Sequence, residues 1–167
     1  MSRLMKSLGI AAVVCGFVVA ASAAQDAGTN LLGKWNILGK DNTVIQSDGI
    51  VACECKTEKE ISGVQQNIEL NQTEPRTIEF SAESKAENAS GETTGYDYGI
   101  YLDITHPDGT KTYGVVVPFK TGAHDWEKAS FSYTPAKPIA SVSYLTLFRN
   151  KTGKVWFRNA VLGVVGK

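Results

Sequence analysis

The stretch YGIYLDITHPDGTKTYGVVVPF, at positions 98–119, decides the fold class. Its first half alternates apolar side chains at positions 98, 100, 102 and 104 with a mixed set at the positions between them. Side chains of a β-strand point alternately to opposite faces, so this half predicts a strand with one buried face. HPDGT at 106–110 then supplies the Pro, Asp and Gly of a tight hairpin turn. The returning strand has its own apolar set, Tyr113, Val115, Val117 and Phe119.

The same alternation recurs elsewhere, for example over 64–70 and 78–83, between segments rich in Gly, Pro, Asn and Asp. NKTG at 150–153 predicts a second hairpin, in which a four-residue loop would pair Arg149 with Lys154 and Leu147 with Trp156. About eight to ten short strands at this spacing indicate an all-β protein. We expect one two-sheet antiparallel β-sandwich, or jelly roll, over residues 25–167.

Residues 1–24 are not expected to belong to that domain. Two basic residues precede an apolar run that ends near Ala20, and small residues follow it. This order is typical of a secretory signal peptide, with cleavage after Ala23 or Ala24, and the run is short for a membrane span. The pattern predicts a secreted or periplasmic protein with no membrane attachment after signal cleavage.

The charge balance argues against a nucleic-acid partner. The chain has 17 Lys and Arg against 17 Asp and Glu, with no long basic run, whereas nucleic-acid binding normally leaves a basic footprint.

Cys53 and Cys55 remain after signal cleavage and would share one face of an extended strand. A bridge between them would be strained, and an intermolecular link stays open, but plain buried thiols are favoured. Neither cysteine has a second Cys or His pair with which to build a metal site.

Several blocks in the expected order carry a family resemblance. They are SKAE at 84–87, DGT at 108–110, PFKTGAHDWE at 118–127, PAKPI at 135–139 and LFRNKTGKVWF at 147–157. Together they resemble the galactose-binding-like, jelly-roll carbohydrate-binding modules of secreted polysaccharide-degrading systems. The resemblance covers nearly all of residues 25–167, and it implies a non-catalytic module that binds a polysaccharide or oligosaccharide, possibly beside separate carbohydrate-active enzymes.

The sequence departs from that family at its structural calcium site. Modules of this type often hold calcium with an acidic residue near the start of the domain and an Asp after the aromatic pair of the last strand. Arg158 stands at the second position, and no Glu stands at the first. A guanidinium cannot ligate a cation and repels it. We therefore predict no cofactor, with structural calcium doubtful and Arg158 paired to a carboxylate instead.

His124, Asp125 and Trp126 raise the question of catalysis. No G-x-S-x-G elbow and no H-E-x-x-H motif accompanies them. They follow Thr-Gly and precede an alternating run, which is typical of a turn that enters a strand. The favoured interpretation is structural, with Asp125 accepting a local backbone hydrogen bond and Trp126 burying its ring. No catalytic residue is predicted.

Aromatic residues are the better candidates for ligand contacts, because the apolar face of a sugar ring stacks on flat side chains while its hydroxyls need a few polar partners. Tyr101 shares a strand face with Asp103, opposite the core side chain Tyr98, and is our first choice. For Trp156 core packing is favoured, although both faces of its strand carry apolar groups. The full set of candidate ligand-binding residues is Tyr101, Asp103, Trp35, Trp126, Arg149 and Trp156.

The function that these features predict is carbohydrate binding without catalysis. Two alternatives stay open: an extracellular or envelope interaction protein that keeps the sandwich without binding sugar, and a small polysaccharide hydrolase or lyase on the same fold.

Overall fold

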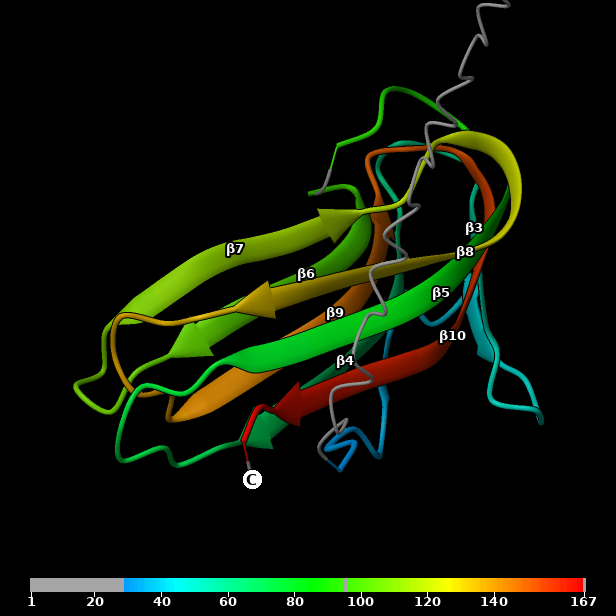
Figure 1. Ribbon diagram of the computed structural model, residues 1–167. Helices are drawn as coiled ribbons and strands as arrows, with labels where there is room; N and C mark the ends of the chain where they lie inside the picture. The colour runs from blue at the N-terminus through cyan, green and yellow to red at the C-terminus, as the bar shows by residue number, and fades with distance from the viewer. Residues whose placement is uncertain (1–28, 95, 167) are drawn as a thin grey trace, which may run out of the picture.

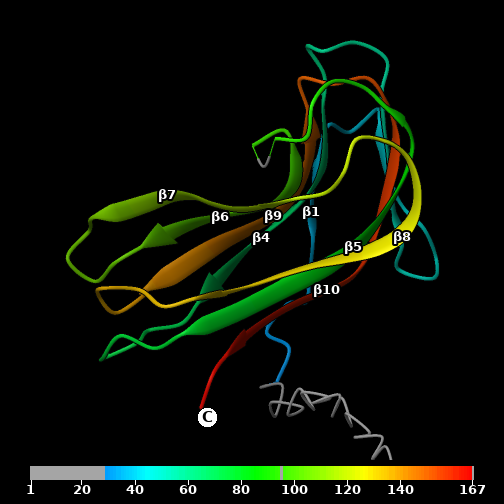
Figure 2. The same cartoon turned by 45° about the horizontal axis from the view of Figure 1, so that its top comes forward.

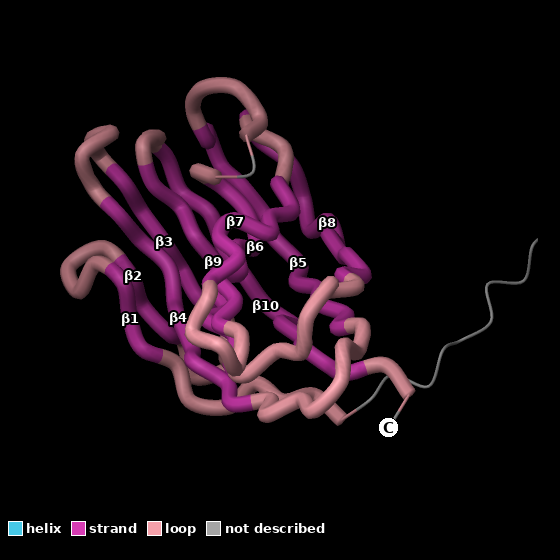
Figure 3. Tube along the Cα trace, turned by 90° about the vertical axis from the view of Figure 1, so that its left-hand side faces the viewer, coloured by secondary structure: helices cyan, strands magenta, loops and turns pink. Residues whose placement is uncertain are grey.

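A computed structural model describes residues 29–94 and 96–166. This part of the chain folds into two five-stranded antiparallel sheets that face each other (Figures 1 and 2). Sheet A contains, in spatial order, β1 (Asn36–Leu38), β4 (Ile61–Glu69), β9 (Ser141–Arg149), β6 (Tyr98–Thr105) and β7 (Lys111–Pro118). Sheet B contains β2 (Thr43–Ile45), β3 (Val51–Cys55), β10 (Gly153–Val164), β5 (Ile78–Ala89) and β8 (Gly122–Tyr133). All regular structure in the described part is strand (Figure 3), so the predicted all-β sandwich is confirmed.

The core lies between the sheets and is formed by the alternating sets of the sequence. In β6, Tyr98, Ile100, Leu102 and Ile104 are fully buried. Their neighbours Tyr101 and Asp103 point to the opposite side, which we call the outer face of sheet A. HPDGT closes the β6–β7 hairpin as predicted, with the amide of His106 donating to the carbonyl of Thr110 at 2.9 Å.

The prediction of a second hairpin at NKTG was wrong. β9 pairs with β4 and β6 of sheet A, whereas β10 pairs with β3 and β5 of sheet B. The segment therefore carries the chain from one sheet to the other, and Arg149 pairs with Ile61 instead of Lys154. A local turn signal cannot distinguish a hairpin from a sheet-to-sheet crossing, because the long-range partners of each strand decide between them.

The pairing of β10 also decides which face of the last strand is buried. Val155 and Phe157 are at most 1% exposed and face the core. Trp156 lies between them in sequence and therefore points to the outer face of sheet B, where it is half-buried. Core packing of Trp156, which the sequence favoured, is thus wrong.

A β-bulge in β7 corrects a second assignment. The register with β6 shifts between Leu102 and Ile104, so that the pair Leu102–Val115 is followed by Ile104–Thr112. Gly114 occupies the extra position with a φ of 70°, which glycine adopts without steric cost. Because Thr112 faces inward, Tyr113 turns to the outer face of sheet A and is 66% exposed. The expected grouping of Tyr113 with the apolar set of that strand is therefore wrong.

Cys53 and Cys55 are free thiols, 3% and 1% exposed, on the inner face of β3. This agrees with the favoured interpretation of plain buried thiols.

The proposed signal peptide and its cleavage site lie outside the described residues. Within the described part, the structure has no helix long and apolar enough to cross a membrane.

Candidate functional site

Tyr101 and Asp103 lie side by side on the outer face of sheet A, as the alternation of β6 predicted. Both are half-buried. An Asp103 carboxylate oxygen accepts a hydrogen bond from the backbone amide of Gly114 at 3.2 Å. The bulge in β7 therefore fixes this carboxylate against the sheet instead of leaving it free in solvent.

Two further tyrosines join Tyr101 on this face. Tyr96, which precedes β6, packs edge-on against Tyr101 with ring centroids 6.4 Å apart. Tyr96 is 55% exposed, and Tyr113 is 66% exposed. Sequence reasoning missed both as site residues, since Tyr96 lies in a loop and Tyr113 changes face only through the bulge. The Tyr-Gly pair at 113–114, inside an otherwise regular strand, was the available signal for such a bulge.

Arg149 stands at the end of β9 and fixes the loop that carries Tyr96. Its Nε donates to the backbone carbonyl of Tyr96 at 3.1 Å and lies 3.8 Å from Oδ1 of Asp97. Asp97 also accepts a hydrogen bond from the side-chain amide of Asn150 at 2.9 Å. Arg149 is thus brought together with Tyr101 and Asp103, and its guanidinium positions the neighbouring tyrosine.

The polar groups of this surface are held in defined states. Burial raises the pKa of the Tyr101 hydroxyl, and the negative charge of Asp103 raises it further. Tyr101 therefore stays a neutral phenol at physiological pH and can donate a hydrogen bond. We call the outer-face group Tyr96, Tyr101, Asp103, Tyr113 and Arg149 the tyrosine cluster.

The candidates Trp126 and Trp156 lie on the outer face of sheet B, on the opposite side of the sandwich. The guanidinium carbon of Arg158 stands 3.9 Å from the centroid of the Trp126 ring. One face of this indole is therefore covered by a cation from its own chain. Trp156 is half-buried on β10, which is separated from β8 by β5.

Trp35 occupies a third place, at the edge of the sandwich. Its ring packs on the buried Tyr144 with centroids 5.9 Å apart and lines a cavity of about 270 Å³. The six predicted ligand residues are thus divided among three surfaces. The structure brings together only Tyr101, Asp103 and Arg149.

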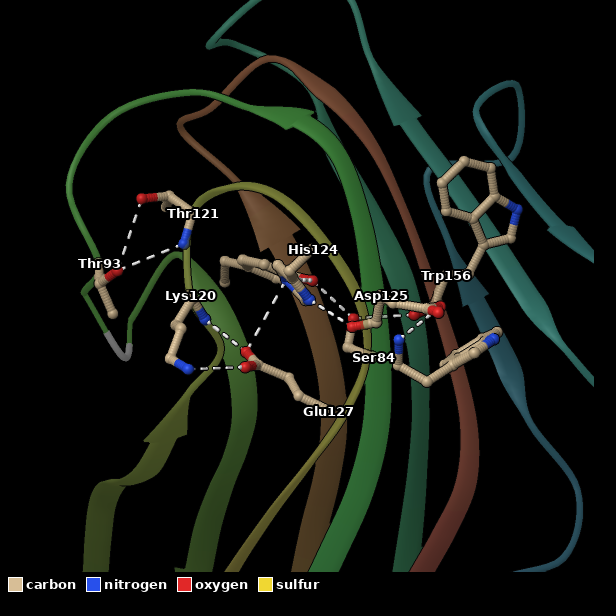
Figure 4. Close-up of polar contacts among 10 residues, drawn as sticks. Ser84, Thr93, Lys120, Thr121, His124, Asp125, Glu127 and Trp156 are labelled. Carbon is tan, nitrogen blue, oxygen red and sulfur yellow. Dashed lines mark hydrogen bonds and ion pairs between the residues drawn. The ribbon is translucent and has the colours of Figure 1, made fainter.

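His124 is half-buried and links exposed neighbours to a buried pair of hydroxyls (Figure 4). The Tyr98 hydroxyl lies 2.6 Å from Oγ of Ser84 and 3.3 Å from Nε2 of His124. Tyr98 and Ser84 are both 0% exposed, so no substrate reaches this pair of hydroxyls. The other nitrogen of His124 lies 2.8 Å from the carbonyl oxygen of Asp125. This arrangement supports the structural interpretation of the motif.

Asp125 and Trp126 also behave as elements of the strand β8. The Asp125 carboxylate accepts a hydrogen bond from the backbone amide of Trp126 at 2.8 Å, as the sequence predicted. Trp126, however, does not bury its ring in the core, because it points outward beneath Arg158.

The residues at the expected calcium position do not fit a cation. Arg158 Nε donates to a carboxylate oxygen of Glu83 at 2.8 Å, and the side chain of Asn159 donates to the other oxygen at 3.1 Å. Both oxygens of Glu83 are therefore occupied by donors. Among residues 29–94 and 96–166, no group of three or more His, Cys, Asp or Glu side chains could hold a metal.

Comparisons with known proteins place the chain by fold. No family model matches the sequence. The curated tRNA(Glu)-specific nuclease WapA of Bacillus subtilis subsp. natto (strain BEST195) is 28% identical over 138 residues. That alignment includes 77% of this chain but only 6% of the nuclease, so the chain spans a small fraction of the length of its curated relative.

Two solved structures share the architecture. The CBM22-1 xylan-binding domain from Paenibacillus barcinonensis Xyn10C is 17% identical, with 87% of this chain and 99% of that domain covered and a TM-score of 0.56. The enzymatically active domain of bacteriophage CBA120 tailspike protein 4 is 11% identical, covers 81% of this chain and 21% of its own, and gives a TM-score of 0.59. The chain therefore has the jelly-roll sandwich found in carbohydrate-binding modules, and the family resemblance seen in the sequence is confirmed at the level of fold.

Proposed function

We propose that the protein binds a carbohydrate chain without catalysis, through the tyrosine cluster on the outer face of sheet A. One observation carries the proposal: three tyrosines, two of them more than half exposed, share one open sheet face with a fixed carboxylate and an arginine. Exposed aromatic faces stack on the apolar side of sugar rings, and a few placed polar groups bind the hydroxyls.

The opposite sheet is the weaker candidate. One face of Trp126 is covered by Arg158, so a sugar would have to displace a cation–π contact worth about 0.5–2 kcal/mol before stacking there. Tyr96 and Tyr113 are each more than half exposed. The ammonium of Lys111 stands over the Tyr113 ring at 5.9 Å from its centroid, which is farther than the 3.9 Å that separates Arg158 from Trp126.

The carboxylates beside the tyrosines support binding instead of hydrolysis. Asp103 accepts a backbone hydrogen bond from Gly114, and Asp97 accepts from Asn150 and from the hydroxyl of Thr94. A glycosidase needs one carboxyl group kept protonated as an acid and a second placed across the bond. Asp103 and Asp97 are instead held in place by hydrogen bonds from the protein, as fixed acceptors that suit the binding of sugar hydroxyl groups.

The neighbouring structures point to a polysaccharide ligand. The P. barcinonensis domain, similar to this chain over almost its full length, is described as xylan-binding. The proposed setting outside the cytoplasm rests on the sequence-based signal peptide, and the proposed work beside separate carbohydrate-active enzymes rests on the family resemblance.

A glycan array followed by calorimetric titration tests the proposal. We expect residues 25–167 to bind one class of oligosaccharide, with xylo-oligosaccharides as the first probe. Tyr101→Ala and Tyr113→Ala should each weaken that binding about tenfold or more, as loss of a dominant contact does. Trp156→Ala is the matched control, because it removes an aromatic ring from the opposite sheet and should leave the affinity unchanged.

Two results would overturn the proposal. Absence of binding to every glycan would favour an interaction protein that has kept the sandwich. Loss of binding in Trp156→Ala, with Tyr101→Ala unaffected, would place the site on sheet B.

A further inference from the structure

A cavity at the edge of the sandwich is separate from the tyrosine cluster. It has a volume of about 270 Å³ and opens between the two sheets beside the segment that precedes β1. Its walls come from both sheets and that segment, and they carry polar side chains as well as an apolar group. They include Leu32, Trp35, Val51, Val64 and Phe157.

A buried hydroxyl without a partner lines this cavity. Thr146 of β9 is 1% exposed, and its Oγ1 makes no hydrogen bond with any described residue. A buried hydroxyl left unpaired costs about 1–3 kcal/mol. Most such groups in proteins have a partner, either protein or a bound molecule, so a guest with a polar atom at this depth would satisfy Thr146.

The rim of the cavity is polar, but its positively charged side chain, Arg158, already has partners within the protein. Arg158 reaches the rim while its guanidinium pairs with Glu83 and stacks on Trp126. Asp48 stands at the same rim, exposed, and among the described residues it takes part in no ion pair. The cavity therefore presents a net negative rim, which disfavours an anionic guest.

The size of the cavity limits the guest to one ring. At about 30 Å³ for each water molecule, the space corresponds to about nine waters. It is smaller than the pockets of about 300–1,000 Å³ that hold drug-sized ligands. A neutral ring that combines apolar C–H groups with hydroxyls matches the indole wall, the unpaired hydroxyl and the polar rim together.

We propose that this cavity binds a single neutral sugar ring, with an apolar side against Trp35 and one hydroxyl hydrogen-bonded to Thr146. Such a site holds a free monosaccharide or the end of a chain, because its volume of about 270 Å³ suits one ring. It is independent of the tyrosine cluster, whose open face suits the middle of a chain.

Nuclear magnetic resonance can test this site directly, because the chain has only three tryptophans. The indole N–H signals report separately on the cavity, through Trp35, and on sheet B, through Trp126 and Trp156. Titration of the protein with D-xylose, D-glucose and D-galactose should shift the Trp35 signal with at least one sugar and leave the other two in place. D-glucuronate, the charged comparison, should bind more weakly than D-glucose.

Variants of Thr146 identify the buried contact. Thr146→Val removes the hydroxyl and should weaken the binding of the effective sugar about fivefold or more, whereas Thr146→Ser keeps the hydroxyl and should retain binding. Thr134→Val is the matched control, since Thr134 is exposed and lies outside the cavity. Thermal melts of all three check that each variant is folded.

Three outcomes contradict the proposal: a Trp35 signal that no neutral sugar moves, an affinity that Thr146→Val leaves unchanged, or tighter binding of glucuronate than of glucose. The first would mean that the cavity holds water only. None of these results bears on oligosaccharide binding at the tyrosine cluster, which is measured separately.

Discussion

The guanidinium carbon of Arg158 lies over the indole of Trp126, 3.9 Å from the ring centroid, and the guanidinium pairs at the same time with Glu83. The three side chains come from β10, β8 and β5, so the contact links three adjacent strands across the outer face of sheet B. A cation–π contact of this kind contributes about 0.5–2 kcal/mol, depending on how far it is desolvated.

Glu83→Gln should make the stability of the protein less dependent on acid pH. Hydrogen bonds from Asn159 and Arg158, followed by the charge of Arg158, lower the pKa of Glu83 in the folded state. A carboxylate with a lowered pKa stabilises the fold above its unfolded pKa of about 4.3, and this contribution is lost as the pH falls through the folded value. Because the pair is partly exposed, we expect the variant to lose about 1 kcal/mol or less at pH 7.

Urea unfolding at pH 7 and at about pH 3 measures this effect. The difference between wild type and Glu83→Gln should shrink at the lower pH. Glu58→Gln, at an exposed carboxylate with no ion pair among the described residues, serves as the control. A difference that grows on acidification would contradict the prediction.

Gly114→Ala should disturb both the fold and the tyrosine cluster. Its φ of 70° disfavours any residue with a Cβ, and an added Cβ would stand 3.0 Å from Cε1 of Tyr96. The left-handed conformation alone costs about 1–2 kcal/mol. Displacement of Tyr96 from Tyr101 should in addition weaken oligosaccharide binding.

Gly109→Ala separates the two effects, since Gly109 has a φ of 80° and no heavy atom within 4 Å of an added Cβ. This variant should lose similar stability and keep its affinity. Melting curves and calorimetric titration of both variants give the comparison. Equal affinity losses in the two would mean that Gly114 acts only through stability.

His124→Ala and Trp126→Ala should both leave oligosaccharide binding intact and differ from wild type in stability. His124 contacts the buried Tyr98, with ring centroids 6.2 Å apart. Trp126 is half-buried beneath Arg158, so we expect a loss near the lower end of the range of about 3–5 kcal/mol for a buried tryptophan, or below it. Denaturant unfolding and a glycan titration measure both quantities. A hydrolytic activity that disappears with His124→Ala would restore the enzyme alternative.

Cys53 and Cys55 should be unreactive in the native protein. Burial raises the pKa of Cys53 to about 12 and that of Cys55 to about 11. At pH 8 both therefore remain protonated, and the thiolate is the form that reacts. A thiol reagent such as dithionitrobenzoate should modify neither cysteine until denaturant is added, and then modify both. Reaction of one thiol or none in the denatured, unreduced protein would indicate a disulfide.

Calcium and chelator should leave the thermal melting temperature unchanged. Arg158 and Asn159 already satisfy both oxygens of Glu83, and tight binding to the native state would stabilise it by mass action. Scanning calorimetry with EDTA and with added calcium checks this expectation. A chelator-induced fall of several degrees would reveal a metal that the charge pattern argues against.

The local pattern of the sequence determined the strand character of this protein. Alternation along 98–104 identified the buried face of β6 and placed Tyr101 with Asp103 on the other face, because the side-chain period of a strand is a local property. The same reasoning located the HPDGT turn. It placed His124 and Asp125 in a turn that enters a strand, whereas β8 already begins at Gly122 and includes both residues. It also predicted a sandwich, since many short half-buried strands require a second layer to cover their apolar faces.

Only the tertiary structure decided which strands are partners. The strands before and after NKTG lie in different sheets. Arg149 therefore pairs with Ile61 instead of Lys154, and Trp156 points to the outer face of sheet B. The bulge at Gly114 moved Tyr113 to the tyrosine cluster. A strand face is buried only where another strand or sheet packs on it, and no single segment of the sequence specifies that partner. The residues of the candidate site could therefore be grouped only in the folded chain.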